Sequence, residues 1–495
     1  MLEIKDFSKN TTIISFFLIG LSSFLVRIFL IDFNLPVTLD ALEYFSYANE
    51  IKIQGGLPIN YALDNNGWPI FLSGFFKIFD GYDGIFYMNF QKVLTSVIST
   101  LTIIPVYFLA RKFLSKKISI ICIGFFTFEP RLIINSTLGI SEPIYLFVMV
   151  MILTLFLTNN QKLITLSFGL TGLITIIRAE GIFLFIVLSI VFFYKFQKDK
   201  KIFYYLIGLA IFTIILLPYF DYQTNIHGND RVISRVIINF EDTLYGEKII
   251  EGLFTYFKML GWNLIPFFIV ILPFGLKEIL KRNSFEKFFG MIFFITMSVP
   301  ALYAYTCGAN DTRFLYFIFP IIAIISGIKF EKIILRYKNE KIWFPVIFFL
   351  LIITSISFIE YKTDDIFDKE SFIISNEIIE KIGKVNNYYP ESKYLSSAKA
   401  LDIFPESIAN FERPYITSTG SEYHTLEEFI INEKENGLTH LVVDNSSHRE
   451  LFFKDVFNNE EKFPYLEKIY DSSDNGLFYH LKLFKINYEL FLKNN

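Results

Sequence analysis

Two acidic residues, Asp40 and Glu43, follow the first hydrophobic segment of the chain and are three positions apart. In a helix this spacing puts both carboxylates on one face. The segment 40–53 has a polar and an apolar face, which predicts a helix lying on a membrane surface. A carboxylate there could deprotonate an acceptor hydroxyl as a general base or bind a divalent cation. The alternative is an ordinary polar helix in an outer loop.

Other charged residues stand at the ends or breaks of apolar segments. Glu142 opens a long one within Ser141-Glu142-Pro143, either as a functional carboxylate or as a charge that stabilises a helix N-terminus. Arg178 and Glu180 interrupt the apolar run 163–194. We favour an internal ion pair that holds a hairpin; the alternative is that Arg178 faces an anionic headgroup.

Arg313 opens a later apolar segment within Asn310-Asp311-Thr312-Arg313-Phe314. An arginine at the outer interface can bind a phosphate through paired donors, or it can simply extend its charge out of the apolar layer. No His and Asp cluster with convincing metal-ligand spacing appears, so a divalent cation and any other cofactor are left open. The two cysteines, Cys122 and Cys307, predict neither a disulfide nor a metal site.

The elements that carry these residues are predicted to be membrane spans. The chain has 495 residues, of which 53% are hydrophobic and 60 are Phe. Runs of about 18 or more apolar residues are typical of transmembrane helices. We predict about eleven spans, at 12–31, 86–110, 118–135, 140–158, 163–177, 181–194, 202–219, 260–276, 288–305, 313–328 and 342–359. The first lacks a cleavage site after it and is expected to be retained.

Basic residues cluster in alternate loops, which places those loops in the cytoplasm. They lie in the loops around 111–117, 195–201, 277–287 and 329–341. The run 163–194 has basic flanks on both sides, so we interpret it as two short spans that meet at an outer tip. The expected result is a multi-pass cell-membrane protein with a cytoplasmic N-terminus and an external tail.

The tail from about 365 loses the long apolar runs and predicts a small external α/β domain, after a membrane domain over 1–360. From Glu360 onward there are 25 acidic and 15 basic residues, whereas the whole chain has a net charge of −3. Residues 425–435 predict a helix capped by Thr425 with Glu428. Residues 438–444 predict a buried strand, and 477–486 a final strand.

Taken in order, these features resemble the GT-C superfamily of membrane glycosyltransferases, and most of all its protein mannosyltransferase and aminoarabinose transferase group. The resemblance rests on the first-loop acid Asp40, Asn66-Gly67-Trp68-Pro69 with the apolar segment 71–79, Ser141-Glu142-Pro143, Arg178-Ala179-Glu180-Gly181, and Arg313 with Tyr316 and Pro320. It covers about 10–335. The family often has adjacent acids in the first loop, whereas Asp40 and Glu43 are separated by two residues. The Trp-Trp-Asp-Tyr-Gly motif of the oligosaccharyltransferase branch is absent from the tail.

The resemblance implies transfer of a hexosyl or mannosyl-type sugar from a polyprenyl phosphate (dolichyl phosphate in an archaeal host) to an external protein, glycan or lipid, with inversion. Asp40, with Glu43 as a second candidate, would be catalytic. Arg313 and Arg178 would bind the donor phosphate, and Glu142, Glu180 and Tyr316 are further site candidates. The alternatives are a transporter or flippase for a lipid-linked sugar, and a membrane scaffold whose tail binds a partner. No basic patch indicates nucleic acid.

Overall fold

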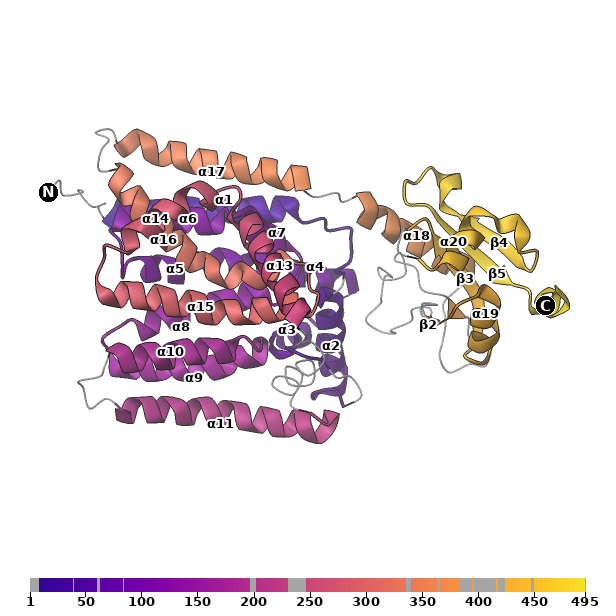
Figure 1. Ribbon diagram of the computed structural model, residues 1–495, viewed down its shortest axis with the longest axis horizontal. Helices are drawn as coiled ribbons and strands as arrows, with labels where there is room; N and C mark the ends of the chain where they lie inside the picture. Colours follow the sequence, from indigo (N-terminus) through magenta and orange to yellow (C-terminus); the bar gives the residue numbers. More distant parts are fainter. Residues whose placement is uncertain are drawn as a thin grey trace. The chain divides into compact units, whose positions relative to one another are not determined.

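The chain forms two compact units in a computed structural model (Figure 1). The first contains residues 1–32, 40–80 and 90–362, and the second contains 33–39, 81–89 and 363–495. The structure describes residues 9–38, 40–59, 63–82, 84–195, 202–229, 246–334, 340–362, 366–382, 394–395, 415–416, 423–446 and 449–494.

The described chain up to Lys362 is helical. Its helices are α1 (Lys9–Leu30), α2 (Asp40–Gln54), α3 (Gly67–Ile78), α4 (Gly84–Leu101), α5 (Ile103–Ala110), α6 (Lys116–Thr127), α7 (Pro130–Thr137), α8 (Glu142–Phe156), α9 (Gln161–Ile177), α10 (Gly181–Lys195), α11 (Ile202–His227), α13 (Gly246–Leu264), α14 (Phe268–Ile279), α15 (Ser284–Thr306), the 3-10 helix η1 (Thr312–Ile318), α16 (Phe319–Ile334) and α17 (Glu340–Lys362). The predicted helix over 40–53 is confirmed as α2. The break at Arg178 separates α9 from α10, as expected for two short segments.

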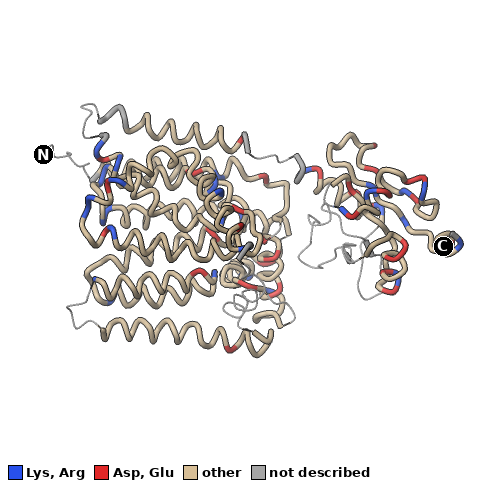
Figure 2. The backbone as a smooth tube through the Cα atoms, in the orientation of Figure 1, with Lys and Arg blue, Asp and Glu red and all other residues tan. Residues whose placement is uncertain are grey.

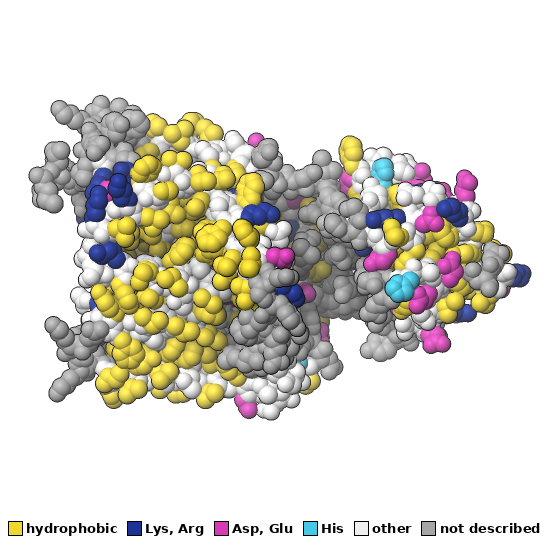
Figure 3. Space-filling model, viewed as in Figure 1, with side chains coloured by type: hydrophobic (Ala, Val, Ile, Leu, Met, Phe, Trp, Pro, Cys, Tyr) yellow, Lys and Arg dark blue, Asp and Glu magenta, His cyan; other side chains and the backbone are white. Residues whose placement is uncertain are grey.

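Within the described residues, five helical segments are long and apolar enough to cross a membrane, and seven if each of two bent pairs is one span. Four shorter apolar helices lie at Glu142–Phe156, Gln161–Ile177, Gly181–Lys195 and Phe344–Glu360. Figure 3 shows hydrophobic side chains over the flank of the first unit, and Figure 2 shows Lys and Arg gathered at one end of its helices. The chain is therefore built as a membrane protein, and the count of eleven spans stays a prediction.

Two segments that we expected to be single spans are bent. The axis turns by 55° between α6 and α7, and by 101° between α13 and α14. Each turn has a proline at or beside it: Pro130 is the first residue of α7, and Pro266 lies between α13 and α14. Proline has no N–H to donate and disfavours the helical conformation in the residue before it. The segments predicted as spans at 118–135 and 260–276 are therefore each formed by two helices rather than by one.

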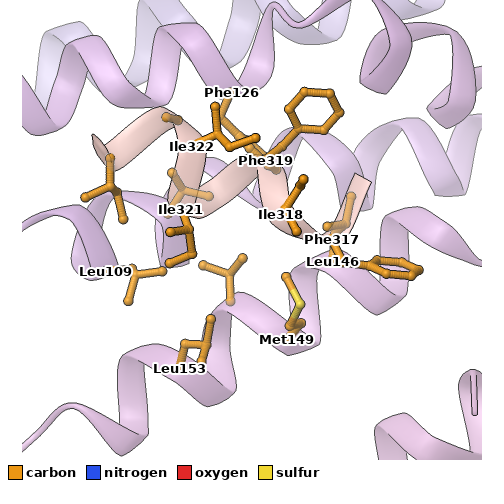
Figure 4. Close-up of a cluster of buried hydrophobic side chains, with 14 of the residues drawn as sticks. Leu109, Phe126, Leu146, Met149, Leu153, Phe317, Ile318, Phe319, Ile321 and Ile322 are labelled. Atoms are coloured by element: carbon orange, nitrogen blue, oxygen red, sulfur yellow. The ribbon is translucent and has the colours of Figure 1, made fainter. Parts of the chain in front are cut away.

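The core of the helical unit is formed by large aliphatic and aromatic side chains. Figure 4 shows Phe317, Ile318 and Ile321 of η1 and α16 opposite Met149 and Leu153 of α8. All five are buried. Because η1 continues directly into α16, this packing fixes the position of the chain at Thr312 and Arg313.

A buried arginine joins four helices. Arg27 of α1 donates hydrogen bonds to Ser99 of α4 at 3.1 Å, to the Thr127 carbonyl of α6 at 3.0 Å and to Ser136 of α7 at 3.0 Å. It also binds the carbonyl and hydroxyl of Ser23, one turn earlier. A buried charge is costly unless its donors are satisfied, and these neutral oxygens satisfy them. The sequence analysis did not identify this residue.

The second unit contains a five-stranded sheet in the order β2-β1-β3-β5-β4. Its strands are β1 (Tyr394–Leu395), β2 (Tyr415–Ile416), β3 (Leu438–Asp444), β4 (Leu466–Asp471) and β5 (Leu481–Ile486), with helices α18 (Ile366–Ile382), α19 (Leu426–Glu435), α20 (Leu451–Asn458) and α21 (Tyr488–Asn494) and the short 3-10 helices η3 (Glu460–Lys462) and η4 (Ser472–Asn475). β1 pairs in parallel with β2 and β3, whereas β5 is antiparallel to β3 and β4.

Alternating residues of β3 pack on opposite faces of this sheet. Val442 packs with residues of α18, and Leu441 and Val443 pack with residues of α19 and α20. This strand has the limits that the sequence predicts, and Thr425 caps α19 by accepting the Glu428 N–H. The final strand begins at Leu481 rather than 477, because η4 and Gly476, which has a positive φ, precede it.

Candidate active site

An ion pair joins two of the predicted site residues. Arg313 at the start of η1 contacts Asp40 at the start of α2, with 2.5 Å between Nη1 and Oδ2. The side chains are 29% and 42% exposed, so this pair is reached by solvent. Two residues 273 positions apart are thereby brought into one site.

A second carboxylate holds Arg313 from its own segment. Asp311 caps η1 by accepting the Arg313 backbone N–H at 2.9 Å, and its Oδ2 is 3.1 Å from Arg313 Nε. The backbone here is fixed on both sides, because Tyr305 donates to the Asp311 carbonyl at 2.9 Å and Asn263 donates to the Thr312 carbonyl at 3.0 Å. No sequence argument had selected Asp311. The signal was present, since Asp is a preferred cap residue directly before a helix.

Arg178 lies in a separate, buried group of charges. It pairs with Glu180 and with Glu142, each at 2.9 Å, and donates to Ser141 at 3.2 Å. Its guanidinium also lies 5.5 Å from the centre of the Phe317 ring. The structure thus shows the internal ion pair that we favoured for Arg178 and Glu180, extended by Glu142. Oε2 of Glu142 is buried and has no hydrogen-bond partner among the described residues.

Tyr44 lies between the two groups. It is one turn after Asp40 in α2, and its hydroxyl is 3.4 Å from Ser141, which binds Arg178. Burial raises the pKa of Tyr44 to about 12, although the charge of Arg178 acts in the opposite direction. The phenol therefore stays protonated at neutral pH and can act as a hydrogen-bond donor.

The segment 65–68 holds α2 against the α9–α10 tip. Asn66 donates to the Tyr47 hydroxyl at 3.1 Å and accepts from the Tyr219 hydroxyl at 2.9 Å. Trp68 is fully buried and donates to the Gly139 carbonyl at 3.0 Å, two residues before Ser141. Asn65, with φ of 57°, accepts the Ala179 N–H at 3.0 Å. The Asn66-Gly67-Trp68-Pro69 motif identified in the sequence therefore forms a junction between the elements of the site.

The remaining candidates have no recorded contact with the Asp40–Arg313 pair among the described residues. Glu43 is exposed on α2, and Tyr316 is buried with its hydroxyl 3.2 Å from Thr312. Glu129 and Arg131 form an ion pair of their own at 3.0 Å. In the described parts of the chain no group of three His, Cys, Asp or Glu residues could hold a metal ion.

Comparisons by sequence find no matching family model and no curated relative. Solved structures do match. An oligosaccharyltransferase from Archaeoglobus fulgidus matches with a TM-score of 0.59 at 13% identity, over 88% of this chain and 70% of that one. ArnT from Cupriavidus metallidurans bound to undecaprenyl phosphate matches with 0.58 at 9% identity, over 97% and 98%. The mycobacterial arabinofuranosyltransferase AftD matches with 0.54 at 9% identity, over 98% and 42%.

The chain has the fold of the GT-C membrane glycosyltransferases. The match to ArnT spans nearly the whole of both chains, which includes the tail that had given no family resemblance. The resemblance inferred from the ordered motifs is thus confirmed for the fold. At these identities the fold alone is shown, and the chemistry has to be argued from this chain's own residues.

Proposed function

We propose that this protein is a glycosyltransferase that moves a sugar from a polyprenyl phosphate to an acceptor on the outer side of the cell membrane. The observation that carries the proposal is the Asp40–Arg313 pair. A carboxylate that can act as a base and a guanidinium that can bind phosphate meet at a half-exposed site. The donor class agrees with two structures of the same fold, ArnT bound to undecaprenyl phosphate and an archaeal oligosaccharyltransferase with a dolichol-phosphate.

In the proposed reaction the hydroxyl oxygen of the acceptor attacks the anomeric carbon of the sugar. Asp40 accepts the proton of that hydroxyl. The bond between that carbon and the phosphate oxygen breaks, and Arg313 stabilises the negative charge on the departing phosphate. One direct displacement inverts the anomeric centre. Glu43 is the second candidate base. Arg178 is a less favoured phosphate ligand, because Glu142 and Glu180 already neutralise its charge.

The second candidate function, a transporter or flippase, uses the same lipid-linked sugar without breaking a bond. Such proteins bind their substrate near the membrane midplane, often between inverted repeats. Here Asp40 begins α2 and Arg313 lies in the first turn of η1, and both side chains are partly exposed to solvent. This location favours chemistry at the membrane surface.

The test is to incubate the purified chain with polyprenyl phosphates that carry radiolabelled sugars and a set of protein, glycan and lipid acceptors. We expect label on an acceptor and free polyprenyl phosphate. Asp40→Asn should lower turnover by about 10²–10⁴-fold, the usual loss when a general base is removed. If label crosses a vesicle membrane while it stays on its lipid, the chain is a transporter. Near-normal turnover in Asp40→Asn would exclude this residue as the base and make Glu43→Gln the next variant.

A further inference from the structure

We propose that Arg313 exchanges one of its two carboxylates for the donor phosphate while the other keeps the guanidinium in place. Asp40 is the carboxylate that leaves, and Asp311 is a positioning residue that stays. This inference rests on the proposed function, because the incoming anion is the phosphate of the lipid-linked donor. It adds a role for Asp311 and an order of events.

The two carboxylates bind different edges of the guanidinium. Asp311 Oδ2 lies 3.1 Å from Nε, an ion-pair distance at which Nε makes no hydrogen bond within the described chain, whereas Asp40 accepts a hydrogen bond from Nη1. Among the described residues no hydrogen bond to Nη2 is found. When Asp40 withdraws, Nη1 and Nη2 together present the two parallel donors that a phosphate binds. The contact between Nε and Asp311 does not have to break.

The two contacts also differ in how firmly they are built. Asp311 is two residues from Arg313, caps the same helix through its other oxygen, and lies in backbone held by Tyr305 and Asn263. Asp40 belongs to a different helix, and Arg313 is the partner found for its carboxylate in the described chain. Asp311 is exposed to a similar degree, 48% against 42% for Asp40, so exposure does not set the two ion pairs apart. What differs is the backbone that holds each carboxylate, and a phosphate that uses both terminal nitrogens can replace the carboxylate that comes from the separate helix.

The exchange orders the reaction. While Asp40 is paired with Arg313, its Oδ2 oxygen accepts a hydrogen bond from the guanidinium and is not available to an acceptor hydroxyl. Donor phosphate removes the guanidinium from Asp40 and frees the carboxylate for the acceptor hydroxyl. The base is thus released when the donor is bound, so an acceptor that arrives first meets an engaged carboxylate.

The inference predicts that two substitutions, each of which removes one negative charge, change the affinity for the donor in opposite directions. Asp40→Asn removes the competitor of the phosphate, and donor affinity should rise about threefold to fivefold, the value of one exposed ion pair. Asp311→Asn keeps the helix cap, since Asn is an equally good cap residue, but weakens the hold on Nε. Donor affinity should fall about threefold to fivefold, the value of one exposed ion pair.

The sign of the second effect separates positioning from simple electrostatics. An anion binds more tightly when a nearby carboxylate is removed, so repulsion alone predicts that Asp311→Asn raises the affinity. A loss of positioning lowers it. Asp311→Ser, which also keeps a cap residue but is too short to reach Nε, should behave as Asp311→Asn does. Asp221→Asn, an exposed carboxylate on α11, is the matched control and should leave the affinity unchanged.

The experiment measures binding of a polyprenyl phosphate without sugar to the full chain in lipid nanodiscs, for these variants and for each Asp311 variant combined with Arg313→Ala. We expect the Asp311 substitutions to have no further effect once Arg313 is absent. A purely structural role would lower the affinity equally in both backgrounds and would overturn the inference. So would unchanged or tighter binding in Asp311→Asn, or unchanged or weaker binding in Asp40→Asn.

The outcome also distinguishes this inference from the proposed function. If Arg313→Ala binds the lipid phosphate as well as the wild type does, the phosphate role of Arg313 is wrong and the exchange is wrong with it. If the binding pattern is as expected but no sugar is transferred to any acceptor, the exchange stands and the transferase assignment is wrong.

Discussion

Arginine and lysine carry the same charge but present it differently, and this difference tests what Arg313 does. A guanidinium offers a planar pair of donors, whereas an ammonium is a single point of charge. If Arg313 binds phosphate with both terminal nitrogens and Asp311 with Nε, lysine cannot make all of these contacts. We expect Arg313→Lys to lose donor affinity by about tenfold, close to the loss in Arg313→Ala, which corresponds to about 1.4 kcal/mol.

The comparison is made by titrating the same lipid phosphate into wild type and both variants. An arginine that only extends its charge out of the apolar layer can be replaced by lysine without loss. If Arg313→Lys keeps the wild-type affinity and Arg313→Ala loses affinity, position 313 contributes its positive charge but not a planar pair of donors. Equal affinity in all three would place the phosphate elsewhere, with Arg178 as the first alternative.

At the scale of single residues, the sequence identified charged residues of the candidate site but not which residues they contact. Asp40 and Arg313 stood out because each is a charge at the edge of an apolar segment. Their contact could not be predicted, since residues so far apart meet only through the packing of many helices. For Arg178 the sequence suggested one partner, Glu180, and the structure adds Glu142 from another helix. Asp311 was missed because an acidic residue in a short polar loop has many ordinary explanations.

At the scale of elements, the approach of α3 to the end of α9 depends on a glycine. A Cβ on Gly67 would lie 2.7 Å from the Ile177 backbone nitrogen, closer than real contacts allow. Because backbone cannot move aside as a flexible side chain does, Gly67→Ala should destabilise the protein by about 1–3 kcal/mol. It should also lower transfer activity, because the same junction holds α2 through Asn66 and Tyr47.

The matched control is Gly74→Ala in the same helix. Nothing lies within 4 Å of a Cβ built there, so alanine should be neutral or stabilise α3 by about 0.5–1 kcal/mol. Thermal unfolding in detergent, measured beside sugar transfer, tests both variants. Equal stability of the two would mean that the backbone at Gly67 relaxes easily and that the junction is not rigid.

In the second unit, the end of β3 is held by a buried carboxylate. Burial alone would raise the pKa of Asp444, but hydrogen bonds from Arg449 and Tyr479 outweigh it, so the pKa lies below the ordinary 3.8. A lowered carboxyl pKa contributes stability above the ordinary pKa, and this contribution is lost as the pH falls through the lowered one. Asp444→Asn should therefore destabilise β3 at neutral pH, and its difference from the wild type should shrink below about pH 4.

Hydrogen exchange of the β3 amides in the full chain, measured for both proteins from pH 7 to pH 3 after correction for the intrinsic exchange rate, follows this difference strand by strand. Other acidic residues titrate equally in the two proteins and cancel. If the difference between the two proteins stays constant down to pH 3, the hydrogen bonds from Arg449 do not depend on the negative charge of Asp444.

Elements with a strong local signal were predicted well. The helix at 40–53, the break at Arg178 and the strand at 438–444 follow from periodicity, from charges inside an apolar run and from a buried run after a glycine. The bend at Pro266 was missed because hydropathy averages over a window and does not register one backbone nitrogen without a hydrogen. The second sharp bend, at Pro130, has the same explanation.

At the scale of the whole molecule, the distribution of charge predicts the orientation in the membrane. In the first unit Lys and Arg gather at one end of the helices, while acidic residues lie mostly toward the other (Figure 2). Helix α2, which begins at Asp40 of the candidate site, lies at that second end (Figure 1). The positive-inside rule then assigns the basic end to the cytoplasm. The site would face outward, on the side where a lipid-linked donor meets an external acceptor.

This orientation predicts that a reporter that is active only outside the cytoplasm is active when fused after Asn495 of the full chain. The same reporter fused after Arg282, in a basic loop, should be inactive, which controls for expression and insertion. The result depends on two crossings by 163–194, because one crossing would reverse every later segment. Activity after Arg282 with none after Asn495 would thus contradict the two-span interpretation of α9 and α10. It would also place the tail in the cytoplasm, where no external acceptor could reach it.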